Sequence, residues 1–128
     1  MIAITPVYAA LLALFFVFLS IRVVLQRREA KVALGDGGNR PLLRRLRVHG
    51  NFAEYVPLAL ILMLLAELQQ APGWLVNATG ILLVAGRVLH AAAVSREPEP
   101  LPLRATGMAL TMSAIIIGAV TNLVLGIA

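Results

Sequence analysis

The stretch RVHGNFAEYVPLALILMLLAEL, Arg47 to Leu68, changes character near its middle. Its first eleven residues include charged and polar side chains, and after Pro57 it becomes an almost unbroken apolar run. The apolar part, from about Phe52 to Leu68, does not alternate between polar and apolar positions, which is typical of a helix that crosses a lipid bilayer. The stretch therefore predicts a membrane helix with a band of polar groups in its first turns.

The composition places the whole chain among integral membrane proteins. The chain has 128 residues, of which 60% are hydrophobic and 13% are charged, and its mean hydropathy is +0.90. A soluble domain is nearer to half apolar and a quarter charged. Because the apolar runs are long and do not alternate, membrane-spanning strands are not expected. We therefore predict an all-α membrane protein whose length allows one small bundle.

Four segments are long and apolar enough to cross the hydrocarbon, which takes about 20 residues of helix. These segments are residues 4–25, 41–69, 74–95 and 103–127, and they predict a single four-helix domain over residues 1–128. Asn39 followed by Pro41 is typical of a helix start, so the second helix is expected to begin before its apolar part. Pro57 predicts a kink that frees the carbonyl of Ala53. The first segment has no basic n-region and is too long for a signal peptide, so we expect it to be retained.

The net charge of +5 is concentrated in one part of the chain. Seven of the eleven basic residues lie between Arg27 and Arg47, around the first predicted loop. This clustering is typical of a cytoplasmic loop in a membrane protein. Nucleic acid binding is not expected, because no soluble domain and no interleaved aromatic residues accompany the charges. Counting basic residues places loops one and three in the cytoplasm and both termini on the opposite side.

The side chains also exclude some kinds of chemistry. The sequence contains no cysteine, so it forms no disulfide and offers neither a thiolate metal ligand nor a thiol nucleophile. The two histidines, His49 and His90, lie far apart in sequence and lack companion ligands at the spacing of a metal site. We therefore expect no bound metal.

Ionisable residues at membrane depth are costly and usually face a bundle interior or a water-filled cavity. At about 100° per residue, polar residues of the second segment form one stripe. The stripe consists of Arg44, Arg47, Asn51 and Glu54, with Tyr55 at its edge. Two guanidinium groups, an amide and a carboxylate can bind a ligand that carries both signs of charge. The alternative is an internal pairing of arginine and glutamate that only holds helices together.

Further polar candidates lie on the other segments. Arg87 and His90 are one helical turn apart on one face of the third segment. Either a bound anion or an ion pair between Arg87 and Glu54 would account for this buried charge. Arg22 lies near the end of the first segment. Its side chain could bind a ligand, or it could extend to the membrane surface instead. Arg104 lies at the start of the fourth segment, and a helix N-terminus favours anions; an ordinary interfacial anchor is the alternative.

The motif RVHGNFAEYVP resembles the signature helix of the MAPEG proteins, the membrane-associated proteins in eicosanoid and glutathione metabolism. That signature has arginine, asparagine, glutamate and proline at the spacing of Arg47, Asn51, Glu54 and Pro57. The GDGG of the first loop and the AGRVLH of the third segment are similar to the small bacterial members. The similarity covers nearly the whole chain.

The resemblance implies a homotrimer of four-helix subunits in a bacterial inner membrane, with glutathione as co-substrate between neighbouring subunits near the cytoplasmic face. Arg104 matches the arginine that lies near the thiol and is the expected catalytic residue. The sequence departs from the family pattern at two positions. Val94 stands where several members have a tyrosine, and Ala105 stands where one branch has a serine. The residues expected to bind glutathione are Arg22, Arg47, Asn51, Glu54, Tyr55, Arg87 and His90.

The chemistry of these residues agrees with this ligand. Glutathione carries two carboxylates, which suit arginines, and one ammonium group, which suits Glu54. Lowering the pKa of its thiol from about 8.5 to about 6.5 requires about 2.7 kcal/mol, which Arg104 is expected to supply. We predict a glutathione transferase or peroxidase for lipophilic electrophiles. The alternatives are a non-catalytic binding or structural trimer and a small multidrug transporter. The transporter would need a carboxylate that residues 4–25 lack.

Overall fold

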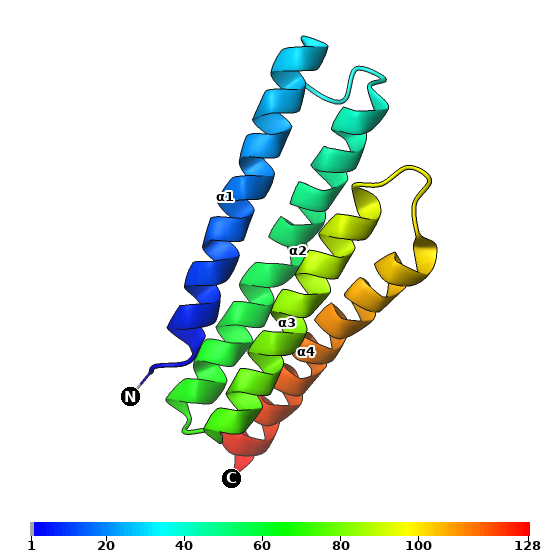
Figure 1. The fold of residues 1–128 in the computed structure, drawn as a ribbon. Helices are drawn as coiled ribbons and strands as arrows, with labels where there is room; N and C mark the ends of the chain where they lie inside the picture. The colour runs from blue at the N-terminus through cyan, green and yellow to red at the C-terminus, as the bar shows by residue number, and fades with distance from the viewer. Residues whose placement is uncertain (1) are drawn as a thin grey trace.

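The computed structural model describes residues 2–128, which form four helices and no strand. The helices are α1 (Thr5–Ala30), α2 (Arg40–Leu68), α3 (Gly73–Val94) and α4 (Leu101–Ile127). Each helix is long and apolar enough to cross a membrane, so the predicted all-α fold is confirmed. Both termini lie at one end of the bundle, with the α2–α3 loop, and the other two loops lie at the opposite end (Figure 1).

The start of α2 follows from its sequence. The side-chain oxygen of Asn39 accepts a hydrogen bond from the backbone N–H of Leu42 at 2.9 Å, which satisfies one of the free donors of the first turn. The helix then continues through Pro57 to its end. The loop before it turns back through three glycines with left-handed backbone angles, which glycine adopts without strain. These glycines are Gly35, Gly37 and Gly38.

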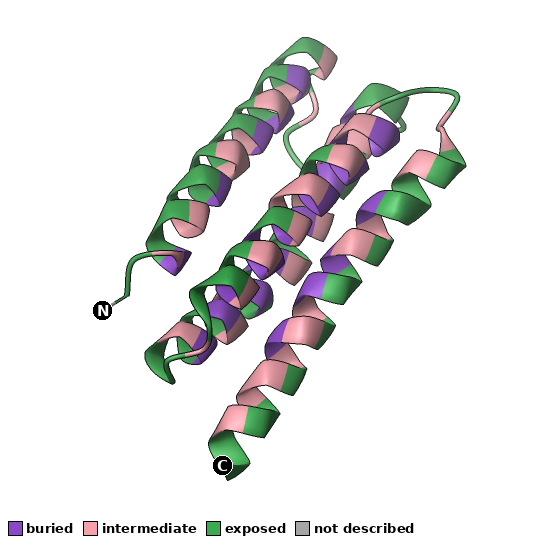
Figure 2. Ribbon diagram, turned by 60° about the horizontal axis from the view of Figure 1, so that its bottom comes forward, coloured by how far each residue is buried: buried purple, intermediate pink, exposed green. Residues whose placement is uncertain are grey.

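The core lies between the helices, and the outer surface is also apolar. Buried faces turn inward and exposed faces turn outward on every helix (Figure 2). Leu14, in the middle of α1, has 70% of its surface exposed. Such outer faces suit lipid, which is as apolar as the side chains that contact it. The fully buried apolar side chains include Leu12, Leu19, Leu42, Val48, Met63, Leu83 and Ala114.

The helices α3 and α4 make the most extensive contact in the bundle. They approach each other at two glycines. A Cβ atom at Gly107 would lie 2.6 Å from the backbone nitrogen of His90, and one at Gly86 would lie 2.8 Å from the carbonyl oxygen of Gly107. Small residues permit such close approach of membrane helices. This contact sets the position of Arg87 and His90 on α3 relative to α4.

Glu67, near the end of α2, binds the start of α1. Its carboxylate oxygens accept hydrogen bonds from the backbone N–H groups of Ala3, Ile4 and Thr5, each at 2.7 Å. The first N–H groups of a helix have no partner within the helix, and negative charge is favoured there. One carboxylate therefore fixes the N-terminus of α1 against the end of α2.

We expect Glu67→Gln to lower the free energy of unfolding by about 1–2 kcal/mol, because an amide offers one acceptor oxygen in place of two and has no charge. Thermal unfolding of the purified protein in detergent measures this change. Glu29→Gln is the matched control, since Glu29 lies exposed at the other end of α1. Its stability should stay within about 0.5 kcal/mol of the wild-type value. Equal stability of the two variants would show that the contact contributes nothing.

Candidate functional site

A cleft opens at the end of the bundle where α2, α3 and α4 meet, close to the α3–α4 loop. Its volume is about 180 Å³. We call it the arginine pocket, because four of its seven lining residues are arginines and only one is acidic. The lining residues are Arg40, Leu43, Arg44, Arg47, Val94, Glu99 and Arg104. The cleft therefore brings two of the predicted site residues together.

The helices explain why these arginines gather. Arg40, Arg44 and Arg47 lie on successive turns at the start of α2, so they share one face. Arg104 lies in the first turn of α4, beside that face. Arg47 is exposed and forms no hydrogen bond or ion pair with the residues that the structure describes. The pocket thus presents at least one guanidinium group that is free to meet a ligand.

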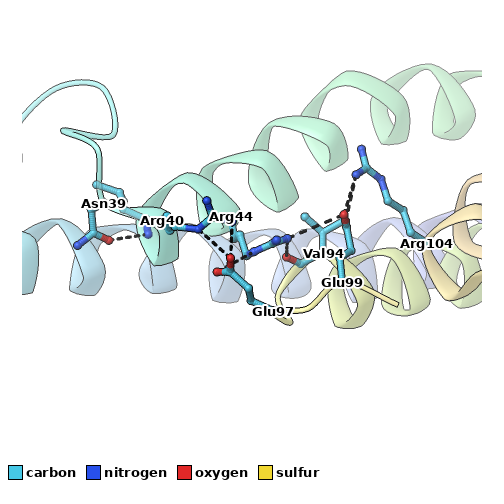
Figure 3. A network of polar contacts seen from close by, with 8 residues as sticks. Asn39, Arg40, Arg44, Val94, Glu97, Glu99 and Arg104 are labelled. Atoms are coloured by element: carbon cyan, nitrogen blue, oxygen red, sulfur yellow. Dashed lines mark hydrogen bonds and ion pairs between the residues drawn. The ribbon is translucent and has the colours of Figure 1, made fainter. Parts of the chain in front are cut away.

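Two carboxylates from the α3–α4 loop point between these arginines (Figure 3). Glu97 accepts a hydrogen bond from Nε of Arg40 at 2.7 Å and lies 3.5 Å from Nε of Arg44. Glu99 lies 3.0 Å from Nη1 of Arg104 and 4.0 Å from Nη1 of Arg44. The hydrogen bond from Arg40, together with the charges of Arg40 and Arg44, holds the pKa of Glu97 below its ordinary value. Glu97 is therefore ionised at neutral pH, and both loop carboxylates pair with arginines of the pocket.

Arg87 lies deeper in the bundle, two turns along α3 from Val94. Only 2% of its surface is exposed. Its guanidinium group donates hydrogen bonds to the side-chain oxygen of Asn51 at 2.6 Å and to the hydroxyl of Thr111 at 3.1 Å. It also lies 5.8 Å from the centre of the Tyr55 ring. Within residues 2–128 it pairs with no carboxylate, so a buried positive charge lies below the pocket without a counter-ion.

The contact with Arg87 orients Asn51. A guanidinium group can only donate, so the oxygen of Asn51 must face Arg87. The amide NH₂ of Asn51 forms no hydrogen bond with the described part of the chain and is left as a donor. Asn51 lies one turn deeper on α2 than Arg47. The orientation of this donor, one turn below Arg47, therefore depends on Arg87.

The other predicted residues are less closely grouped. His90 is buried one turn above Arg87, and its imidazole ring makes no hydrogen bond to residues 2–128. Glu54 is exposed on the outer face of α2, and the ion pair with Arg87 that the sequence allows is not formed. Arg22 lies in a separate cleft between α1 and α3, where it donates to the hydroxyl of Ser95 at 3.1 and 3.2 Å. Arg22 and Glu54 therefore stand apart from the arginine pocket.

Sequence reasoning missed several residues of this region. The spacing of Arg40, four residues before Arg44, is a helical signal that would have added it to the stripe. Glu97 and Glu99 follow no motif, and only the folded loop shows which charges they meet. Thr111 looks like any small residue on a membrane helix, although its hydroxyl holds Arg87.

Comparison with known proteins agrees with this architecture. A model of the MAPEG family matches residues 5–124. Two relatives, both named inner membrane protein YecN, come from Escherichia coli K12 and Escherichia coli O6:H1 strain CFT073. Each is 38% identical over 120 residues, covering 94% of this chain and 90% of the relative. No solved structure matches the chain significantly.

The family match includes α1 to α3 and nearly all of α4. It also includes every residue of the arginine pocket and the buried contact between Arg87 and Asn51. The four apolar helices and the inner-membrane relative agree on the bilayer as the environment of the chain. The chain is a membrane protein and belongs to the MAPEG family.

Proposed function

We propose that the chain binds glutathione in the arginine pocket and uses its thiolate to conjugate or reduce lipophilic electrophiles. The observation that carries this proposal is a cationic cleft above a buried arginine that has no counter-ion among residues 2–128. Glutathione has two carboxylates for such a site and brings its own thiol, which suits a chain without cysteine. The activity would be that of a glutathione transferase or a glutathione-dependent peroxidase.

The residues present fit this ligand. Arg47 has no partner among the described residues, and the NH₂ group of Asn51 points away from Arg87, so both can donate to a carboxylate. Arg87 would act as a positioning residue through Asn51. His90 and Tyr55 lie on the neighbouring turns and would complete the wall. Ligand pockets for small molecules usually hold about 300–1,000 Å³, so the 180 Å³ of one subunit accommodates only part of the ligand.

A second subunit would supply the rest of the site. Glu54 lies exposed on the outer face of α2 at membrane depth, where an unpaired carboxylate in lipid is costly. Another copy of the chain packed on that face would remove Glu54 from lipid and enclose Arg47. We therefore propose a homotrimer with glutathione at its subunit interfaces. In this arrangement Arg22 would contact glutathione only in the site of a neighbouring subunit. The loops beside the pocket would lie in the cytoplasm.

The proposed chemistry needs a thiolate. Arg104 would stabilise it, because a guanidinium group near the sulfur favours the charged form of the thiol over the neutral form. In conjugation, the sulfur would form a bond to an electrophilic carbon of a substrate that enters from the bilayer, while a leaving group departs with its bonding electrons. In peroxide reduction, the sulfur would take the outer oxygen of the hydroperoxide as the O–O bond breaks and the alcohol leaves. A second glutathione would then reduce the resulting sulfenic acid, giving the disulfide and water. Val94 and Ala105 provide no hydroxyl group, so we assign the stabilisation of the thiolate to Arg104.

A non-catalytic glutathione-binding trimer is the second candidate. It is favoured by the missing hydroxyl groups and by the pairing of Arg104 with Glu99, which offsets the charge that would stabilise a thiolate. Turnover assays on the purified protein separate the two candidates, using several lipophilic electrophiles and an organic hydroperoxide. Binding of glutathione without any turnover would favour the second candidate, and absence of binding would contradict both.

Arg47→Gln should raise the dissociation constant of glutathione at least about tenfold, because a charge-assisted hydrogen bond contributes about 1.5–3 kcal/mol. Its unfolding temperature should equal that of the wild type, since Arg47 has no partner in the described part of the subunit. Isothermal titration calorimetry in detergent measures the affinity. Arg28→Gln, an exposed position at the end of α1, is the matched control for net charge. A similar loss of affinity in both variants would show that Arg47 makes no specific contact.

A further inference from the structure

The carboxylates of the segment SREPEP, residues 95–100, lie against the arginine pocket. We call this segment the acidic loop. Its two carboxylates do not face solvent freely but pair with the arginines of the pocket. The side chain of Glu99 is only 14% exposed, whereas that of Arg104 is 48% exposed. Glu99 is therefore folded inward over the pocket, toward the residue that the proposed chemistry needs most.

The geometry of this contact resembles that of a bound ligand. Both oxygens of Glu99 lie within hydrogen-bond distance of Nη1 of Arg104, at 3.0 and 3.1 Å. The same carboxylate also faces Arg44 at 4.0 Å. An anionic group of a ligand that approaches Nη1 of Arg104 would meet Glu99 there. The two negative charges would repel each other at this nitrogen, so the ligand and Glu99 compete for it.

We propose that Glu99 is an internal competitor for the arginine pocket, and that an acidic ligand binds by displacing it from Arg104. Glu97 holds the neighbouring Arg40 in the same way and keeps the acidic loop close to the pocket. Proline on both sides of Glu99 restricts the backbone, which lowers the entropy lost when the carboxylate is held in place. The inference rests on the proposed function, since it concerns the ligand of the same pocket.

This competition links the binding of an acidic ligand to the availability of the Arg104 charge. While Glu99 pairs with Arg104, the charge of that guanidinium group is largely offset. When a ligand carboxylate or thiolate takes the place of Glu99, Arg104 becomes available to the ligand, while Glu97 still holds Arg40. The acidic loop therefore determines the affinity of the site for acidic thiols, and Glu99 is the residue on which this depends.

The test is the affinity of glutathione for the purified full chain, measured by calorimetry at fixed ionic strength. Glu99→Gln should lower the dissociation constant about two- to fivefold, the range expected for removing an exposed ion pair. Glu29→Gln, which changes the net charge equally but lies at the end of α1, should change it less than twofold. In an Arg104→Ala background the further change Glu99→Gln should give a smaller gain than in the wild type, because only the longer contact of Glu99 with Arg44 remains.

A second measurement does not depend on glutathione. Phenylglyoxal modifies accessible guanidinium groups, and peptide mapping gives its rate at each arginine. Arg104 should react at least about twofold faster in Glu99→Gln than in the wild type, while Arg28 should be unchanged. Equal or weaker glutathione binding by Glu99→Gln, or an unchanged rate at Arg104, would overturn the proposed competition. Failure of every variant to bind glutathione would instead overturn the proposed function.

Discussion

Arg104→Ala is expected to lower glutathione-dependent turnover about a hundredfold, while the dissociation constant of glutathione rises less than tenfold. The pKa of the thiol would return from about 6.5 toward about 8.5, a difference of about 2.7 kcal/mol, when the guanidinium group is removed. The two carboxylates of the ligand would still meet Arg44 and Arg47. Removing a group that stabilises the transition state lowers turnover more than binding.

This difference can be checked by steady-state kinetics and calorimetry on the same preparations. Arg96→Ala is the matched control, because Arg96 is exposed in the adjacent loop outside the arginine pocket. The activity of Arg104→Ala should recover as the pH rises toward about 8.5, since the thiol then ionises without help. Equal losses of binding and turnover, or a pH profile like that of the wild type, would show that Arg104 only holds the ligand.

Gly107→Ala is expected to lower the free energy of unfolding by about 2–3 kcal/mol, a large effect for one methyl group. The added Cβ would lie 2.6 Å from the backbone nitrogen of His90 and 2.9 Å from the carbonyl oxygen of Gly86. Backbone atoms cannot move aside as a flexible side chain can, so α3 and α4 would have to separate. This cost exceeds the gain of about 1 kcal/mol that alanine brings to a helix.

Gly126→Ala is the matched control on the same helix. Its Cβ would meet only the side-chain oxygen of Gln69, at an ordinary contact distance of 3.8 Å. We expect its stability to equal or exceed that of the wild type. Separation of α3 from α4 would also move Thr111 away from Arg87, so Gly107→Ala should weaken glutathione binding as well. Equal unfolding temperatures for the two glycine variants would contradict the close approach of the helices.

The four helices were predictable because the signals for them are local. Apolar runs of membrane-spanning length and the pair Asn39 and Pro41 determine the spans and the start of α2, whatever the rest of the chain does. The helical spacing also placed Arg44 and Arg47 on one face, and both line the pocket. Periodicity relates residues of one helix, so these groupings needed no knowledge of the tertiary fold.

The contacts between segments were not predictable in the same way. The sequence suggested Glu54 as a partner of Arg87, but the rotation of α2 against α3 places Asn51 there instead. The position of Glu67 in sequence does not show that it meets the N-terminus of α1. The inward fold of Glu99 depends on the path of the α3–α4 loop. The first two contacts join residues far apart in sequence, whereas Glu99 and Arg104 are five residues apart and meet because of the way the loop folds.

The ultraviolet absorbance of the thiolate, recorded while purified protein is titrated with glutathione at neutral pH, tests the account most directly. S-Methylglutathione, which has the same carboxylates but no free thiol, provides the baseline for binding alone. We predict a saturable thiolate signal that the wild type shows and Arg104→Ala loses. If glutathione saturates the wild type without a thiolate signal, the arginine pocket binds the ligand but does not activate it, and the proposed enzyme mechanism is wrong.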